Sequence, residues 1–327
     1  MCPMTDLPLV PICRVRDLPP PPQGRRGWPW TRTSRPIPPR APNGEPWPVI
    51  GIVTPSYNQG AYIEETLRSV LLQRYPRLEY VVVDGGSTDR SPAVIKRYGR
   101  FLSHWVSEKD RGQSHAINKG MARLARAEWV TWLNSDDILL PGALQAVGEW
   151  VLGQRRTDSV AVVGHGIHFK QGERRLIPAE RRPDLDRHNL RNWRRSSFLQ
   201  PACFFSRAAF EKAGALDESL HYAMDFDLWV KLGELGDFEL IDAVLARDLH
   251  HPDAKTQRAM GTYLAEACEI LFRRGYPQDA RQTIADLFDE YRYLSAMTNR
   301  VTRNAFYRRF LQPAMRRLLG APEHLRQ

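Results

Sequence analysis

Short apolar runs alternate with amphipathic stretches in the first part of the chain. Residues 49–53 form an apolar run closed by Pro55, whose missing backbone N–H suits a strand end. Residues 63–71 then place apolar side chains at helical spacing. The next run, LEYVVVD at 78–84, is apolar on both faces, which is typical of a buried parallel strand. The pattern therefore predicts a β–α–β unit inside a sheet.

The same alternation continues to residue 133. It predicts a helix over 92–98, a short strand at 104–107, a helix over 113–126 and a strand at 130–133. Such alternation indicates a doubly wound α/β sheet with right-handed crossovers. Ligands of these sheets bind at the carboxyl ends of the strands. We therefore expect one cleft lined by Pro55 to Asn58, Asp84 to Asp89, Ser107 to Gly112 and Asn134 to Asp137.

The two flanks of the chain have a different character. Residues 1–47 are dense in proline, which removes N–H donors and blocks regular helix and sheet, so we expect a mostly disordered arm. Later strands are expected in VAVVGHGIHF, at the start of QPACFFSRAAFEKAG and at 240–245. From Tyr263 onward the pattern is helical, amphipathic and finally strongly basic. We expect an α/β domain over 48–256 and a basic helical extension over 257–327.

Composition restricts the class of protein. Of the 327 residues, 42% are hydrophobic and 26% charged, as in ordinary globular domains, and no apolar run could span a bilayer. Proline and arginine interrupt any secretory signal, and four scattered cysteines suggest reduced thiols, so we expect a cytoplasmic protein. The net charge of +10 indicates an acidic partner or a solvated basic surface. Without an aromatic-interleaved basic motif, nucleic acid is not the expected partner.

Two adjacent carboxylates, Asp136 and Asp137, follow the strand at 130–133. Like charges this close raise one another's pKa unless a cation or a proton lies between them. A helix start would explain one acidic residue, but not two at the mouth of the expected cleft. Mg²⁺ and Mn²⁺ prefer few carboxylates completed by water and phosphate oxygens. The pair is therefore a candidate site for Mn²⁺ or Mg²⁺ with a diphosphate ligand.

Other acidic positions allow both a structural and a functional interpretation. Asp84 heads DGGSTD, where a tight turn with Asp89 capping the next helix would explain the sequence by itself. No G-x-G-x-x-G follows the first strand, which argues against a dinucleotide dehydrogenase. Asp225 and Asp227 precede an apolar helical face. They are either first-turn acids favoured by the helix dipole, or one of them is a general base for an acceptor hydroxyl.

Basic residues near the expected cleft give weaker signals. Arg111 is the best phosphate candidate because it lies in a converging loop, whereas Lys119 and Arg123 are equally well explained as solvated charges. His250 and His251 could ligate a metal or contact phosphate, but surface histidines are common.

The motifs, taken in order, resemble those of the family 2 glycosyltransferases, which have the GT-A fold, a nucleotide-sugar-binding α/β sheet. Each motif is unspecific alone, but their combination and order between residues 49 and 256 are specific. The resemblance implies a GT-A-type mixed sheet. The matching stretches are TPSYNQGAYIEETLRSVLLQRYPRLEYVVVDGGSTD, SEKDRGQSHAINKGMARLARAEWVTWLNSDD, MDFDLWVKL and HPDAKT.

The resemblance also implies a set of residues that bind the nucleotide-sugar. Tyr57 would stack on the base, Asp84 would accept a hydrogen bond from the base, and Asp136 would lie near the ribose. The full set is Pro55, Tyr57, Asn58, Asp84, Arg111 and Asp136.

The resemblance further implies a metal ligand and a catalytic base. Asp137 is the last residue of the D-x-D-type motif and would coordinate the metal on the diphosphate. His251 matches a position near the diphosphate in relatives, with His250 as an equally placed rival. Asp225 matches the catalytic base, although relatives usually carry Glu-Asp where this chain has Met224 before the aspartate.

Three functions are compatible with these residues. The first is inverting, metal-dependent transfer of a sugar from a nucleoside-diphosphate sugar, in the first instance a UDP-sugar, to a saccharide or lipid-linked acceptor in surface polysaccharide or glycolipid assembly. The second is a non-catalytic basic protein on the same fold that binds membrane or nucleic acid, and the third is a nucleotidyltransferase. The basic C-terminal helices suit peripheral contact with anionic lipid at the inner face of the membrane, or a packed tail with a solvated face.

Overall fold

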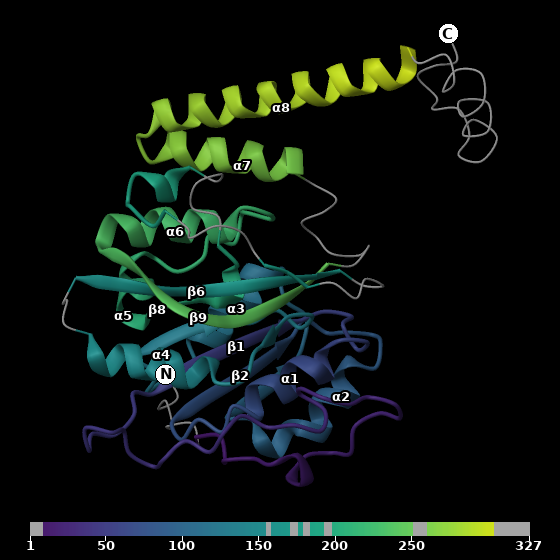
Figure 1. Ribbon diagram of the computed structural model, residues 1–327, viewed down its shortest axis with the longest axis vertical. Coiled ribbons are helices and arrows are strands. Elements are labelled where there is room, and N and C mark those ends of the chain that lie inside the picture. The colour runs from purple at the N-terminus through teal and green to yellow at the C-terminus, as the bar shows by residue number, and fades with distance from the viewer. Residues whose placement is uncertain are drawn as a thin grey trace. The chain divides into compact units, whose positions relative to one another are not determined.

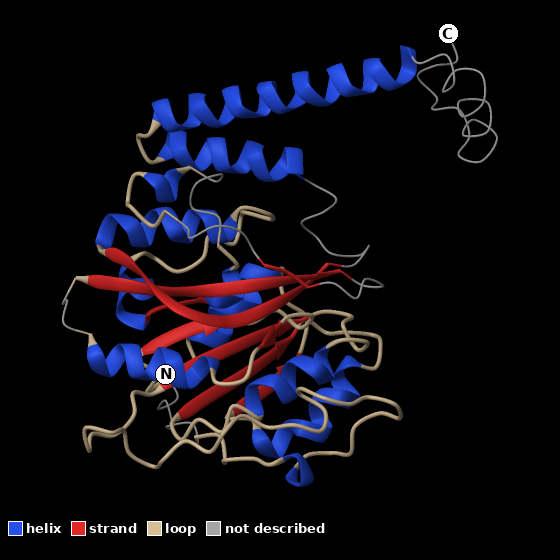
Figure 2. Ribbon diagram, in the orientation of Figure 1, coloured by secondary structure: helices blue, strands red, loops and turns tan. Residues whose placement is uncertain are grey.

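A computed structural model describes residues 9–154, 158–170, 176–178, 184–192, 198–250 and 260–303 (Figure 1). The chain divides into two compact units, residues 1–270 and residues 271–327. In the first unit the described residues form a nine-stranded mixed sheet with helices on both faces (Figure 2). This agrees with the predicted α/β class. The predicted extension over 257–327 is shared between the two units, because helix α7 begins at Met260 in the first.

The sheet is parallel in its first half and mixed in its second. Its strands run in the order β3-β2-β1-β4-β8-β6-β9-β5, and β7 pairs with β6. β1 pairs in parallel with β2 and β4, and β2 pairs in parallel with β3, as the alternating pattern predicts. β8 is antiparallel to β4 and β6, and β5 is antiparallel to β9. The strands are β1 (Ile50–Ser56), β2 (Leu78–Asp84), β3 (His104–Ser107), β4 (Trp129–Trp132), β5 (Ile138–Leu139), β6 (Ser159–Lys170), β7 (Leu176–Pro178), β8 (Cys203–Ser206) and β9 (Asp237–His250).

Helices cover both faces of this sheet. α1, α2 and α4 lie on one face, and α3, α5 and α6 lie on the other (Figure 1). The described helices are α1 (Ile63–Leu71), α2 (Ser91–Tyr98), α3 (Gln113–Met121), α4 (Ala143–Gly153), α5 (Arg207–Lys212), α6 (Met224–Leu235), α7 (Met260–Arg273) and α8 (Pro277–Arg303).

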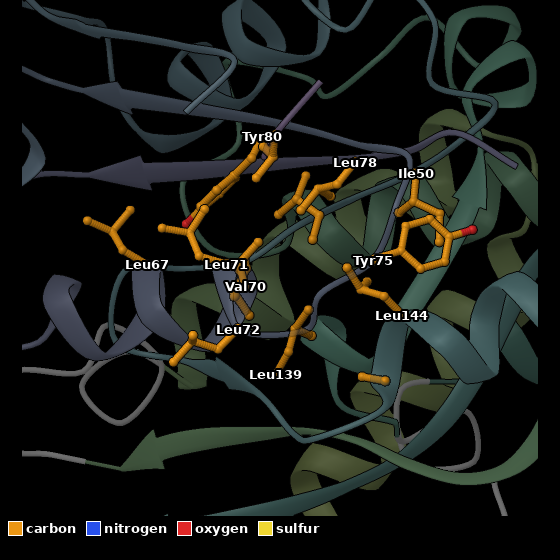
Figure 3. Close-up of a cluster of buried hydrophobic side chains, with 14 of the residues drawn as sticks. Ile50, Leu67, Val70, Leu71, Leu72, Tyr75, Leu78, Tyr80, Leu139 and Leu144 are labelled. Carbon is orange, nitrogen blue, oxygen red and sulfur yellow. The ribbon is translucent and has the colours of Figure 1, made fainter. Parts of the chain in front are cut away.

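A large apolar core fills the space between the sheet and the α1 face. Figure 3 shows Leu67, Val70 and Leu71 of α1 beside Leu78 and Tyr80 of β2. All five side chains are almost completely buried, because the helical spacing of α1 places its apolar side chains on the face that meets the sheet. The opposite face of the sheet carries an aromatic cluster in which Trp132 of β4 stacks on Trp229 of α6, with ring centroids 5.7 Å apart.

Two element boundaries differ from the prediction because tertiary contacts determine them. β9 extends over 237–250 rather than 240–245, since it pairs with β6 on one side and β5 on the other. α3 ends at Met121 instead of continuing to 126. Beyond it, the carboxylate of Glu79 accepts hydrogen bonds from the N–H groups of Arg126 and Ala127, at 3.1 and 3.0 Å, which holds the chain in a non-helical turn.

The proline-rich arm is not disordered over its described residues, which corrects our expectation. Regular helix and strand are nearly absent from residues 9–49, as the prolines predict. The segment nevertheless buries apolar side chains, among them Leu18, Trp30 and Trp47, and thereby packs against the rest of the first unit. The guanidinium of Arg68 on α1 donates hydrogen bonds to three backbone carbonyl oxygens of this segment, those of Pro19 at 2.8 Å, Pro29 at 3.1 Å and Trp30 at 2.9 Å. Residues 1–8 lie outside the described part.

Two further sequence predictions bear on the chain as a whole. Cys13, Cys203 and Cys268 form no disulfide, in line with the expected reduced thiols. In the described part of the chain, none of the helices combines the length and apolar character needed to cross a bilayer. The most basic part of the predicted amphipathic tail, residues 304–327, lies outside the described residues.

Candidate active site

The loops after β1 and β2 lie against each other, as the strand-end rule predicts. The N–H of Gly85 donates to the carbonyl of Ser56 at 2.8 Å, and the N–H of Asn58 donates to Oγ of Ser87, also at 2.8 Å. Oδ1 of Asn58 accepts a hydrogen bond from the N–H of Thr88 at 2.9 Å. Asn58 has a left-handed φ of 54°, a conformation that asparagine tolerates better than most residues. Asn58 therefore joins the two loops at the carboxyl ends of β1 and β2.

Asp84 is completely buried at the end of β2 and ties three segments together. Its carboxylate accepts hydrogen bonds from the Ser87 N–H at 3.0 Å, the Ser87 hydroxyl at 2.5 Å and, beside β3, the Ser107 hydroxyl at 2.7 Å. The turn interpretation is thus correct, and Asp89 caps α2 through the N–H of Ser91 at 2.8 Å. A carboxylate offers about four acceptor positions, so these three hydrogen bonds leave about one of them unused, and the role of Asp84 toward a base stays a prediction.

Tyr57 and Pro55 differ in how they meet the cleft. The side chain of Tyr57 is 63% exposed directly after β1, which leaves its ring available to stack on a planar ligand. Pro55 is buried within β1, opposite Val83 of β2, and therefore shapes the strand end. The predicted roles of both residues toward a nucleotide-sugar stay predictions.

Asp137 is a buried carboxylate surrounded by like charge. It is 6% exposed, Oδ2 accepts from the side-chain amide of Asn134 at 3.1 Å, and Oδ1 accepts from the N–H of Leu249 at 3.3 Å. Burial, the carboxylate of Asp136 and then that of Asp248 raise the pKa of Asp137 well above its usual value. The alternative of a helix start is wrong, because Asp137 leads into β5 and α4 begins only at Ala143.

Asp248 joins this site and was missed by the sequence analysis. β5 and β9 pair with Ile138 opposite Arg247, and the residues that adjoin this pair are Asp137 and Asp248, whose carboxylate is near enough to raise the pKa of Asp137. Asp248 is in turn the register partner of His168 on β6, whose Nδ1 lies 3.0 Å from both carboxylate oxygens. Asp248 on β9 therefore lies near both Asp137 and His168. Only the pairing of β9 with both β5 and β6 creates this cluster, and no local sequence pattern indicates it.

The donor set fits a divalent cation that also uses ligands from a substrate. Asp137 and Asp248 are neighbouring oxygen donors, and burial together with the carboxylates of Asp136 and Asp248 raises the pKa of Asp137, an effect that a bound cation would offset. Among the described residues, no group of three or more His, Cys, Asp or Glu side chains is arranged to hold a metal by itself. Diphosphate oxygens and water would therefore complete the coordination. His251 lies outside the described residues, and so does the side chain of His250, the last residue of β9.

The two acidic residues of α6 have different surroundings. Asp227 is buried and forms an ion pair with Lys231 one turn later, with N and O atoms 2.5 Å apart, so it is a structural residue. Asp225 is only half-buried in the first turn, where Oδ1 accepts from the N–H of Phe226 at 2.7 Å. Met224, which stands where relatives usually carry Glu, accepts a hydrogen bond at Sδ from the hydroxyl of Ser114 on α3 at 2.9 Å. Asp225 is thus the more exposed of these two acids, and its role as a catalytic base stays a prediction.

Arg111, the predicted phosphate contact, pairs with a carboxylate in this structure. Its guanidinium donates to Oε2 of Glu218 from Nη2 at 2.5 Å and from Nε at 3.2 Å. The ion pair is well exposed and joins the loop before α3 to the segment before α6. Lys119 likewise pairs with Glu108. A contact of Arg111 with phosphate would therefore require an exchange of partners.

Two solved structures with a similar fold each contain a nucleotide-sugar. Residues 1–349 of *S. aureus* TarS in complex with UDP-GlcNAc align with a TM-score of 0.55 and 16% identity, over 80% of this chain and 76% of that one. The mannosyltransferase PcManGT from Pyrobaculum calidifontis, in complex with GDP-Man and Mn²⁺, aligns with a TM-score of 0.51 and 20% identity, over 85% and 92% of the two chains. These similarities confirm the GT-A-type fold.

Sequence relatives point to the same family. An uncharacterized glycosyltransferase of Rickettsia typhi is 26% identical over 216 residues, which span 65% of this chain and 67% of the relative. The chondroitin synthase of Escherichia coli is 29% identical over 210 residues, 62% of this chain but only 29% of that longer protein. The model of glycosyl transferase family 2 matches residues 51–214, half of the chain and the part that holds the loops of the cleft. The chain therefore belongs to glycosyl transferase family 2.

Proposed function

We propose that this chain is an inverting, metal-dependent glycosyltransferase that takes its sugar from a nucleoside-diphosphate sugar, in the first instance a UDP-sugar. The observation that carries the proposal is the buried carboxylate of Asp137, which lies at a strand end beside Asp136 and Asp248. Three carboxylates this close need a cation or a proton to offset their charge, and the two structural neighbours described above were solved with UDP-GlcNAc and with GDP-Man plus Mn²⁺. The comparisons support the transferase class, and the donor and metal belong to this proposal.

The residues of the cleft divide the work as follows. Tyr57 stacks on the base, and Asp84 uses its remaining acceptor position to bind it. Asp136 lies near the ribose, while Asp137 and Asp248 hold Mn²⁺ or Mg²⁺, with His251 as a further candidate. When bound, the cation supplies positive charge that offsets the charge on the departing diphosphate.

The reaction itself needs one base and no enzymic nucleophile. Asp225 accepts the proton of the acceptor hydroxyl as its oxygen attacks the anomeric carbon, while the bond to the nucleoside diphosphate breaks on the opposite face. A single displacement of this kind inverts the anomeric configuration. The hydrogen bond from Phe226 N–H to Asp225 stabilises the ionised carboxylate that this role requires.

We also propose that the acceptor is a saccharide or a lipid-linked saccharide in surface polysaccharide or glycolipid assembly, on the cytoplasmic side of the membrane. The similarity to the *E. coli* chondroitin synthase supports this choice. No specific observation favours a non-catalytic binding protein or a nucleotidyltransferase.

The proposal is tested by incubating the purified protein with UDP-, GDP- and dTDP-sugars and Mn²⁺, and by detecting the released nucleotide. We expect nucleoside diphosphate from one donor, abolished by EDTA, by Asp137→Asn and by Asp225→Asn. Asp242→Asn, at a fully exposed side chain on β9, is the matched control and should keep full activity. Release of pyrophosphate would instead indicate a nucleotidyltransferase. No turnover by any donor with any saccharide acceptor, together with no nucleotide binding, would favour the non-catalytic alternative.

A further inference from the structure

The segment that leads into the N-terminus of α6 is held by a residue from another helix. Glu266 of α7 accepts three backbone hydrogen bonds, at Oε1 from His221 at 3.0 Å and at Oε2 from Tyr222 and Ala223, both at 2.8 Å. The capping position of α6 is Ala223, whose side chain offers no acceptor. Free N–H groups at a helix start need acceptors, and a carboxylate there also interacts favourably with the helix dipole. Glu266 therefore anchors the segment that leads into α6, from 43 residues away along the chain.

The same helix contacts the surroundings of Asp225 at a second point. Tyr263 lies one turn before Glu266 on α7, and its ring packs edge-on against Phe226, with centroids 6.4 Å apart. Asp225 lies between Ala223, which donates to Glu266, and Phe226, which touches Tyr263. Burial raises the pKa of the Tyr263 hydroxyl well above its usual value, and the nearby carboxylate of Asp225 adds to this shift. α7 therefore fixes the chain on both sides of the proposed base.

We propose that Glu266 is a positioning residue for glycosyl transfer, which holds the first turn of α6 so that the carboxylate of Asp225 points at the acceptor hydroxyl. This inference rests on the proposed function, in which Asp225 is the base. The family match ends at residue 214 and the matching motifs end at Thr256, so neither includes Glu266. The first part of α7 accordingly contributes to catalysis as part of the first unit, which extends to residue 270.

The size of the effect follows from how proton transfer depends on geometry. A displacement of about 1 Å at a reacting group can lower a rate by about 100-fold. Replacing Glu266 by Gln keeps the size of the side chain but removes its charge and places an N–H₂ group where an acceptor is needed. The donor-binding residues Tyr57, Asp84 and Asp137 lie on other elements, so donor binding should not depend on Glu266.

The test compares Glu266→Gln and Glu266→Asp with Glu269→Gln, an exposed glutamate on the same helix. We expect Glu266→Gln to lower kcat by about 10- to 100-fold, while the Kd for UDP with Mn²⁺ changes less than about threefold. Glu266→Asp, which retains the charge, should lose less, and Glu269→Gln should match the wild type.

The possible results separate this inference from the proposed function. If the wild type turns over a donor and Asp225→Asn abolishes turnover, an unchanged kcat in Glu266→Gln overturns the inference alone. A parallel loss of UDP affinity and turnover in both Glu266 variants also overturns it, since such a loss indicates a general structural role. If Asp225→Asn is fully active, both the proposed base and its positioning residue are wrong.

Discussion

The side-chain hydroxyl of Thr66 donates a 2.7 Å hydrogen bond to the backbone carbonyl of Asp137, although 71 residues separate them in the sequence. Thr66 is completely buried on α1, and one turn later the hydroxyl oxygen of Ser69 accepts from the N–H of Leu139 at 3.2 Å. The helix that packs against the parallel strands therefore also holds the loop of the proposed metal ligand. This contact ties the backbone of Asp137 to the buried core, although burial and the neighbouring carboxylates oppose a charged side chain there.

Replacing Thr66 by Val should weaken metal binding without touching any metal ligand. The substitution keeps the shape of the side chain but leaves the carbonyl of Asp137 without its buried donor, which costs about 1–3 kcal/mol of stability. We expect the affinity for Mn²⁺ in the presence of UDP to fall about 3- to 10-fold, or about 0.7–1.4 kcal/mol, which is the part of that cost felt at the site. Calorimetric titration measures the affinity, with Thr262→Val, at an exposed position of α7, as the control. Equal affinities in the two variants would contradict the role of Thr66.

Replacing Arg68 by Met should release the N-terminal arm. Arg68 is completely buried and its guanidinium supplies the donors for the carbonyls of Pro19, Pro29 and Trp30. Leaving these acceptors unpaired places the substitution in the class that costs about 3–5 kcal/mol. Denaturant unfolding measures this loss, and limited proteolysis should now cut within residues 19–34.

The control for this variant is Arg97→Met. Arg97 is half-exposed and pairs with Glu64 at 3.5 Å, a surface ion pair worth less than about 1 kcal/mol. Cleavage of the arm at the same rate in the wild type would show that the arm is not packed as described.

Two glycine-to-alanine substitutions in helices should have opposite effects. A Cβ on Gly120 of α3 would come within 2.4 Å of the Val53 side chain in β1, so Gly120→Ala forces helix and strand apart. We expect a loss of about 1–3 kcal/mol, as for other overpacked cores. Gly153 at the end of α4 has open space around its Cβ position, so Gly153→Ala should leave stability unchanged or raise it by up to about 1 kcal/mol. Thermal unfolding of both variants measures the contrast, and similar melting temperatures would contradict the close packing of α3.

The contribution of Glu266 to stability should depend on pH. Burial raises the pKa of this carboxyl, but the backbone donors of Ala223, Tyr222 and His221 outweigh burial and leave the pKa below its usual value. A carboxyl with a depressed pKa stabilises the folded state above the unfolded pKa, near about 4.3 for Glu, and loses that contribution as pH falls through the folded pKa. The difference in unfolding free energy between wild type and Glu266→Gln should therefore be constant near neutral pH and shrink in acid. A difference that grows toward low pH would contradict this arrangement.

The parallel half of the sheet could be predicted from sequence because its signals are local. The run over 78–84 and the helical spacing over 63–71 each determine one element, and crossover rules then bring Asn58, Asp84 and Asp137 to one edge. The structure confirms that the loops of Asn58 and Asp84 meet, through hydrogen bonds between Asn58 and the chain at Ser87 and Thr88.

The features that could not be predicted depend on contacts between distant segments. Asp248 reaches Asp137 only because β9 pairs with β5, and Glu266 reaches α6 only because α7 packs beside it. The arm was wrongly predicted to be disordered because proline content describes which regular elements are blocked. It does not show that Arg68, far along the chain, supplies donors for the carbonyls that the prolines leave unpaired.

The most direct test of a metal-assisted nucleotide-sugar site at Asp137 is a calorimetric titration of UDP and GDP into the wild type and Asp137→Asn, with and without Mn²⁺. We expect one of the two nucleotides to bind the wild type only when Mn²⁺ is present. Asp137→Asn should weaken this binding at least tenfold, or about 1.4 kcal/mol. Binding that is independent of Mn²⁺ and equal in the two proteins, or no binding of either nucleotide, would contradict a metal-assisted nucleotide-sugar site at Asp137.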